Sequence, residues 1–111
     1  MDNKQKKYLK DIFDSIEHIE LYLSDNKSFE NYDSNMLLQD AIERNIITIG
    51  EAMNSLLKLN ENIMVSHSRK IVDARNKLTH GYDDIENVQI WNIIIRHLPI
   101  LKTEVEGLLN Q

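Results

Sequence analysis

Apolar residues recur along this chain at intervals of three and four, with polar residues between them, over almost its whole length. That period is typical of amphipathic helices, each of which turns one apolar stripe toward a core. Three glycines and one proline leave few points at which a helix would be interrupted. No segment alternates in the way that indicates a strand. The pattern therefore predicts an all-α protein.

The apolar stripes and the polar stretches between them place the first two helices. The first covers roughly residues 3–24, and residues 25–33 form a connecting loop. Ser34 is placed to cap a long second helix that runs to about Leu59.

Capping residues place the other two helices. The third begins at a serine cap, either Ser66 or Ser68, and Gly81 ends it as the residue just past the helix. Asp83, with Glu86 three residues later, is typical of a capped start for the fourth helix.

Pro99 lies inside the fourth apolar stripe and should kink that helix or split it in two. Helices of these lengths joined by short loops predict an up-and-down antiparallel bundle of four to five helices. A chain of 111 residues is expected to form one domain, covering residues 1–111.

The second predicted helix is apolar over more than one stripe, because Ile46, Ile47 and Ile49 lie on different sides of it. Either it is buried centrally or one of its faces meets another protomer. Gly50 and Ala52 would let a neighbouring backbone approach closely. On this ground a homodimer is as plausible as a monomer.

Composition excludes several classes of protein. Hydrophobic residues make up 41% of the chain and charged residues 28%, as in ordinary globular proteins. No apolar run is long enough to span a membrane, and the amino terminus has no apolar region of a signal peptide. The absence of cysteine excludes disulfides, thiol catalysis and cysteine-bound zinc. The cytoplasm is the expected compartment.

The net charge of −5 argues against a protein that coats nucleic acid indiscriminately. Residues 66–82, however, carry four bases and a single acid. Such a local basic patch can hold a few phosphates on an otherwise acidic body. For Arg69 and Lys70, a role as ordinary solvated helix charges is equally plausible.

The octapeptide at residues 75–82, Arg-Asn-Lys-Leu-Thr-His-Gly-Tyr, holds the main candidate chemistry. A histidine moves protons near neutral pH, and a guanidinium matches phosphate oxygens with a fork of donors. Arg75 and His80 could thus cut an RNA phosphodiester without a metal, with Asn76 on the same helix face as His80. Spacing alone fits a simpler interpretation, in which Arg75 is a surface charge, His80 a helix-end cation and Tyr82 a packing residue.

Other constellations predict no metal and no cofactor. His18, His67 and His97 are scattered, and none of them pairs with another histidine at the spacing of helical metal ligands. The chain has no glycine-rich phosphate loop. Trp91 fits the core better than a stacking platform for bases.

The octapeptide, with Asn directly after Arg and Gly-Tyr directly after His, resembles the signature of the HEPN superfamily. More narrowly, it resembles the HepT-like toxins of bacterial toxin–antitoxin pairs. The resemblance extends over nearly the whole chain and includes further segments at residues 37–44, 49–52, 69–74, 90–91 and 98–101.

This resemblance implies an all-α HEPN fold, a homodimer and a metal-independent endoribonuclease, the toxin of a type VII toxin–antitoxin system. The implied partner is a minimal nucleotidyltransferase antitoxin, which silences the toxin by transferring AMP to the motif tyrosine. By position, Arg75 and His80 are then the catalytic pair. Asn76 orients them, and Tyr82 is the residue converted to O-AMP-tyrosine.

Two further expectations concern the surroundings of the motif. Glu43 and Arg44 could line the same groove, although a solvated helix face explains them equally well. Each chain offers one motif histidine, whereas cleavage through the 2′-hydroxyl needs both a base and an acid, so two copies would supply two His80 side chains. The alternative function is a non-catalytic HEPN module that binds nucleotide or pairs with a nucleotidyltransferase.

Overall fold

The computed structural model describes residues 1–81 and 85–111, and all regular secondary structure in these two ranges is helical. The all-α prediction is confirmed. The elements are α1 (Asn3–Tyr22), α2 (Phe29–Asp33), α3 (Met36–Leu59), α4 (Ser68–Thr79), α5 (Asn87–Asn92), the π-helical segment η1 (Ile93–His97) and α6 (Leu98–Leu109).

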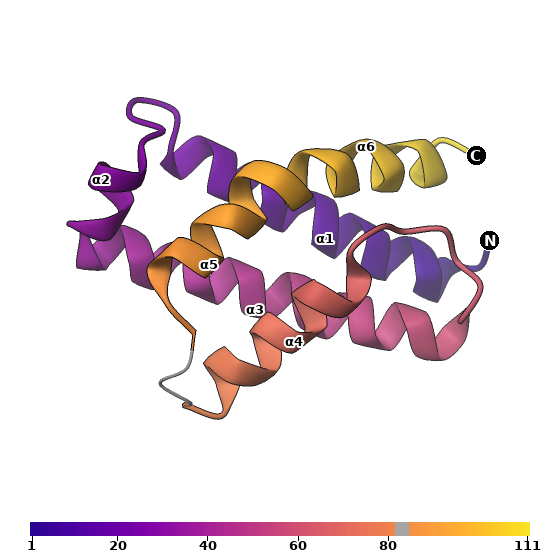
Figure 1. Ribbon diagram of the computed structural model, residues 1–111. Coiled ribbons are helices and arrows are strands. Elements are labelled where there is room, and N and C mark those ends of the chain that lie inside the picture. Colours follow the sequence, from indigo (N-terminus) through magenta and orange to yellow (C-terminus); the bar gives the residue numbers. More distant parts are fainter. Residues whose placement is uncertain (82–84) are drawn as a thin grey trace.

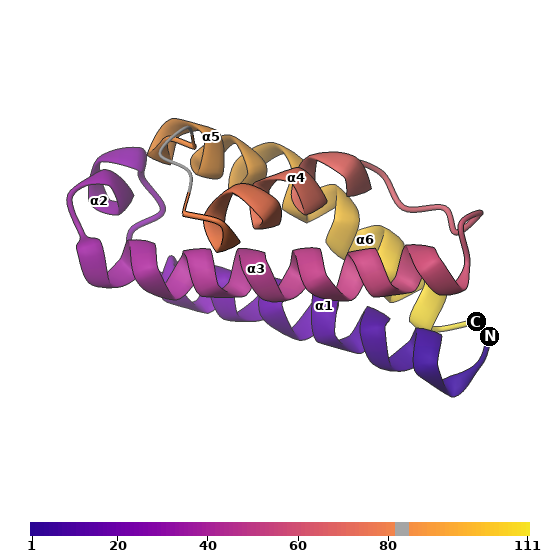
Figure 2. The same ribbon diagram turned by 90° about the horizontal axis from the view of Figure 1, so that it is seen from below.

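The long helices α1 and α3 lie side by side and run in opposite directions (Figure 1). Helix α4 packs on α3, and α6 returns along α1, so the long helices pack in antiparallel pairs. Seen from below, α4, α5 and α6 lie over the layer formed by α1 and α3, and the short α2 lies at one end (Figure 2). Both termini lie at the opposite end.

Helix α3 forms the centre of the core. Ile42, Ile46, Ile49 and Met53 are fully buried between α1 and α4, while Ile47 is only partly buried. Of the two explanations for its broad apolar surface, central burial within one chain therefore accounts for Ile46 and Ile49. Burial of these side chains is the main stabilising term of the bundle.

Helix α4 approaches α3 closely at Gly50. A Cβ added there would overlap the Cβ of Arg75, and it would lie 2.9 Å from the Cγ of Arg75 and 3.2 Å from the carbonyl oxygen of Ile71. The sequence indicated that a neighbouring backbone approaches here. The neighbour is α4 of the same chain, so Gly50 is no argument for a dimer.

The region predicted as a loop at residues 25–33 contains α2, capped by the hydroxyl of Ser28. Ser34 does not cap the next helix, because it is the C-cap residue of α2 and its hydroxyl donates to the carbonyl of Glu30. The cap of α3 is instead Asn35, whose side chain accepts the N–H of Leu38 at 3.0 Å.

Helix α4 also begins without the predicted serine cap. Its N-cap is His67, which has a φ of 60° and makes no side-chain capping bond. Ser66 instead donates its backbone N–H and its hydroxyl to the carboxylate of Glu104, which ties this loop to α6. The other end agrees with the sequence, since Gly81 has a φ of 69°, the left-handed conformation that terminates a helix.

The last helical stretch is split near its proline, as predicted. The backbone N–H of Leu98 bonds to Ile93, five residues back, and Pro99 follows without an N–H to continue the ladder. Helix α5 is capped by Glu86 in a reciprocal pair with Gln89, whereas the predicted cap Asp83 lies outside the described residues. Among the described helices, none has the length and apolarity of a membrane span.

Candidate functional site

Helix α4 carries the candidate residues, and its packing on α3 decides where each of them lies. Ile71, Val72 and Ala74 are buried, so this side of α4 is turned to the core. The Cβ and Cγ of Arg75 lie against Gly50 of α3. The Nε of Arg75 is buried and has no hydrogen-bond partner among the described residues. Packing therefore fixes the stem of this arginine, although the residue as a whole is only half-buried.

His80 is the exposed C-cap residue of α4. Its backbone N–H donates to the carbonyl of Asn76 at 3.1 Å, so Asn76 is one turn earlier on the same side. With 3.6 residues per turn, Arg75 and His80 are about 140° apart around the helix axis. Within one chain they start from different faces of α4. Tyr82, the remaining predicted site residue, lies outside the described residues.

A hollow of about 280 Å³ opens beside this end of α4. Glu43 of α3 lines it together with Lys77 and Gly81. The pKa of Glu43 is raised, chiefly because burial disfavours the charged carboxylate and also because Asp40 is a negative neighbour. Arg44 is exposed and lines another hollow, on the outer side of α3, which Glu43 also lines. The structure thus brings Glu43 to the motif end and leaves Arg44 on the outer face.

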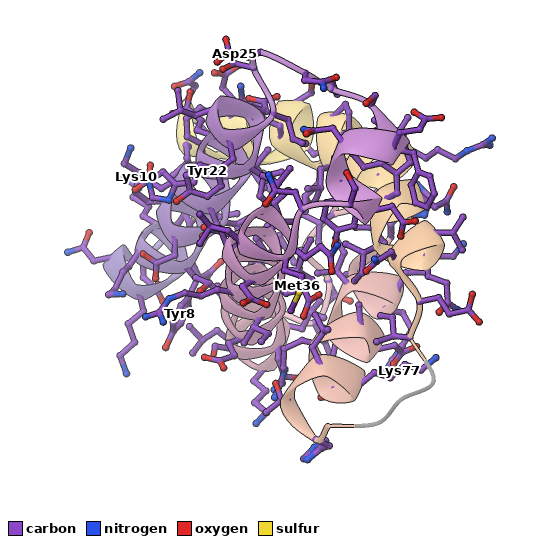
Figure 3. The ribbon with its side chains drawn as sticks, turned by 90° about the vertical axis from the view of Figure 1, so that its left-hand side faces the viewer. Tyr8, Lys10, Tyr22, Asp25, Met36 and Lys77 are labelled. Carbon is purple, nitrogen blue, oxygen red and sulfur yellow. The ribbon has the colours of Figure 1, made fainter. Side chains whose placement is uncertain are left out.

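A larger hollow of about 500 Å³ lies between α4 and the segment formed by α5 and η1. From α4 it is lined by Lys70, Asp73 and Lys77. Lys77 projects from α4 on the side where the chain continues toward α5 (Figure 3). The spacing of these three residues indicates one helix face, but the sequence alone did not reveal which element lies opposite.

The structure also brings His67 and His97 together, with their ring centroids 4.1 Å apart. The expectation that the histidines are scattered is wrong for this pair, because a tertiary contact between the start of α4 and η1 joins them. His97 is only 6% exposed, and neither ring nitrogen has a hydrogen-bond partner among the described residues. Burial lowers its pKa, as do the neighbouring side chains of His67, Lys70 and Arg96. In the described part of the chain, no three side chains are grouped so as to hold a metal ion.

Trp91 is partly buried and packs on the core. Its ring lies 5.8 Å from that of Tyr32 and 6.2 Å from that of Phe29, measured between centroids. This agrees with its interpretation as a packing residue. Tyr32 is fully buried, and burial raises the pKa of its phenol.

Comparison with known proteins identifies the family. The family model described as "Ribonuclease HepT-like" matches residues 12–108, which include the whole of α3, α4 and α5. The chain belongs to the HepT-like ribonuclease family. The resemblance carried by the octapeptide is thereby confirmed at the level of the family.

Three relatives illustrate how far the similarity extends. "Probable ribonuclease HepT" of Thermococcus cleftensis is 30% identical over 97% of this chain and 98% of its own length. A "Putative RNase" of Caldanaerobacter subterraneus is 31% identical over 76% of each chain. A Methanocaldococcus jannaschii protein named "Gamma-glutamylcyclotransferase and putative RNase" is 32% identical over 90% of this chain, which spans only 45% of that protein. No solved structure matches the chain significantly.

Proposed function

We propose that the chain is a metal-independent endoribonuclease, the toxin of a type VII toxin–antitoxin system, and that it acts as a homodimer. The observation that carries the proposal is Arg75-x4-His80 on the helix that ends at Gly81, in a member of the HepT-like ribonuclease family. The exposed imidazole of His80 is the proton-transfer group. The guanidinium of Arg75 binds the phosphate, and Asn76 orients the two.

The proposed reaction uses the RNA's own hydroxyl as nucleophile. The 2′-oxygen attacks the neighbouring phosphorus while the bond from phosphorus to the 5′-oxygen breaks, leaving a cyclic phosphate and a free 5′-hydroxyl. One imidazole takes the proton from the 2′-oxygen, and a second imidazole gives a proton to the leaving 5′-oxygen. Guanidinium groups stabilise the negative charge that builds on the phosphoryl oxygens.

A second copy of the chain supplies the second imidazole in this proposal. A two-fold axis near the end of α4 would place two His80 and two Arg75 side chains in one cleft. The outer face of α3 supports such an arrangement, since its exposed Leu37 and partly buried Ile47 line a hollow that shares Glu43 with the hollow beside Gly81. A dimer built on this face would bring the two motif ends close to each other.

RNA cleavage by the wild type and by His80→Ala, each with and without EDTA, tests the catalytic proposal. The wild type should cut RNA equally well with the chelator present. The variant should lose a factor of roughly 10² to 10⁴ in rate, the usual contribution of general acid–base catalysis, with unchanged helical content by circular dichroism. An obligatory divalent metal would disprove the mechanism. RNA binding without cleavage by the wild type would favour the non-catalytic binding module.

The regulatory part of the proposal concerns Tyr82 and a nucleotidyltransferase antitoxin. AMP attached to Tyr82 adds a phosphodiester charge and a bulky base two residues after His80. This modification would repel RNA phosphates and compete for Arg75. Incubation with the cognate nucleotidyltransferase and ATP, followed by peptide mass spectrometry, should map the adduct to Tyr82. An adduct elsewhere, or a Tyr82→Phe variant that is still modified and silenced, would contradict this assignment.

A further inference from the structure

The hollow between α4 and the α5–η1 segment lies outside the proposed catalytic pair and has the features of a ligand site. Its volume of about 500 Å³ falls within the range of small-molecule pockets, roughly 300–1,000 Å³. His97 lines it and is buried, without a hydrogen-bond partner for either ring nitrogen among the described residues. A buried polar group in this condition is costly to the fold, and a ligand that hydrogen-bonds to it would offset the cost.

The surroundings of His97 favour its neutral form. Burial lowers its pKa, and so do Lys70, Arg96 and His67, whose ring lies 4.1 Å from that of His97 at a tilt of 37°. A neutral imidazole donates one hydrogen bond and accepts another. Both ring nitrogens are buried although the residue lines the hollow, so binding requires a rotation about the Cβ–Cγ bond, a broad torsion, that turns one nitrogen toward the ligand.

The rest of the lining is charged on one side and mixed on the other. Lys70 and Lys77 stand seven residues apart on α4, about 10 Å along the helix, with Asp73 between them. Opposite, Ile93 offers an apolar wall and Asn92 a carboxamide. The hollow thus combines cations, hydrogen-bonding groups and an apolar surface.

We propose that this hollow binds one nucleotide unit, with the base against Ile93 and His97 and the phosphate at Lys70 or Lys77. A nucleobase has apolar faces and an edge that carries both donors and acceptors, which suits an apolar wall next to a neutral imidazole. A lysine ammonium attracts phosphate as a point charge. The carboxylate of Asp73 accepts a hydrogen bond from a ribose hydroxyl or an exocyclic amino group.

The bound nucleotide is part of an RNA strand, and this assignment rests on the proposed function. Lys77 and Ile85 line both this hollow and the smaller one beside Gly81, so the two hollows adjoin. A strand whose phosphate is cut near His80 therefore runs past Lys77, and its neighbouring base enters the larger hollow. This subsite would select the base next to the cleaved bond.

Imidazole NMR signals of the His80→Ala protein report binding directly, because this variant leaves the RNA intact. We expect the ring signals of His97 to shift on titration with a mixed-sequence RNA oligonucleotide and with free nucleoside 5′-monophosphates. Those of His18, which is exposed on α1, should not move. A His97→Leu substitution in the same background should weaken binding of the RNA about fivefold, the effect of one lost neutral hydrogen bond.

Salt dependence tests the lysines. In the His80→Ala background, the double variant Lys70→Ala, Lys77→Ala removes both candidate lysines and should reduce the slope of log affinity against log salt by roughly 0.7, the value for one lost single-strand phosphate contact. Lys6→Ala, which removes an exposed lysine of α1, should leave the slope unchanged. An equal slope in the double variant would overturn the lysine assignment.

The remaining outcomes separate the two proposals. A shift of His97 with mononucleotides alone keeps the nucleotide site and overturns its assignment to an RNA strand. If the ring signals of His97 shift with neither RNA nor mononucleotides, the inference is overturned, even if the wild type cuts RNA. Binding of RNA at His97 by a wild-type protein that does not cleave it would sustain the inference and overturn the ribonuclease.

Discussion

At the scale of single residues, the two motif side chains are held in different ways. Arg75 is fixed by its stem against Gly50 and keeps a buried Nε, whereas His80 is exposed at the helix end. A packed stem limits the conformations of a long side chain and so reduces the entropy lost when it binds phosphate. An exposed imidazole can exchange protons with solvent between turnovers. These are suitable roles for a phosphate clamp and for a proton carrier.

His97 should make the stability of the fold depend on pH. Its pKa is depressed from the ordinary 6.5, by burial and by His67, Lys70 and Arg96. Above pH 6.5 the imidazole is neutral in both states. As the pH falls below 6.5, His97 is protonated in the unfolded chain before it is protonated in the folded chain. The free energy of unfolding therefore decreases.

Chemical unfolding at pH 8 and at pH 5.5 measures this effect. We expect the free energy of unfolding of His97→Leu to fall less between pH 8 and pH 5.5 than that of the wild type. At pH 8 the variant should be at least as stable as the wild type, because two buried nitrogens without a hydrogen-bond partner among the described residues are removed. His18→Gln, an exposed control on α1, should keep the wild-type pH dependence. Identical profiles for the wild type and His97→Leu would contradict this explanation.

At the scale of elements, the packing of α4 on α3 depends on Gly50. We expect Gly50→Ala to destabilise the protein by about 1–3 kcal/mol, as overpacking of a tight core does, since its Cβ would overlap Arg75. The shift of α4 should also lower RNA cleavage. Gly107→Ala is a matched control in α6, where no atom lies within 4 Å of the added Cβ. It should stabilise the protein by about 0.5–1 kcal/mol through helix propensity.

Urea unfolding measures both glycine variants under the same conditions. A Gly50→Ala variant as stable as Gly107→Ala would mean that α4 can move away from α3 at no cost. In that case Arg75 would not be fixed by this contact.

The bounds of the helices were predictable from the sequence where nearby residues determine them. The stripes placed α1, α3 and α4 within a few residues, Gly81 ended α4, and Pro99 divided the last stretch. The caps were less predictable, because a serine hydroxyl has several possible partners. Ser34 bonds back to α2, and Ser66 bonds to a carboxylate of α6 far along the chain.

Contacts between distant segments could not be read from the sequence. His67 and His97 meet only because α4 begins beside η1, and the hollow lined by Lys70 faces α5 for the same reason. Periodicity reports which face of a helix is apolar but not which helix covers it. The motif residues were recognisable, whereas the larger hollow next to them was not.

At the scale of the whole molecule, the two most exposed large apolar side chains among the described residues, Met64 and Leu37, lie on different parts of the chain. Leu37, 80% exposed in the first turn of α3, adjoins the hollow on the outer face of that helix. Met64, 81% exposed, lies in the loop between α3 and α4. This loop leaves α3 at the end of the bundle that holds the termini (Figure 1). The proposed two-copy site needs a partner on the α3 face, because that face adjoins the end of the motif helix.

We therefore expect the wild type to be a dimer at micromolar concentration and Leu37→Glu to be a monomer that no longer cleaves RNA. A stable interface covers about 800 Å² on each partner, roughly one eighth of the 6750 Å² surface of this chain. Burying a carboxylate within it is unfavourable unless a counter-charge is present. The control is Met64→Glu, which changes an equally exposed apolar residue away from the motif and should remain dimeric and active.

Light scattering measures the oligomeric state of each variant, and an RNA cleavage assay measures its activity. A monomeric wild type that still cuts RNA would exclude a site shared between two copies, and a dimeric, active Leu37→Glu would move the interface away from α3.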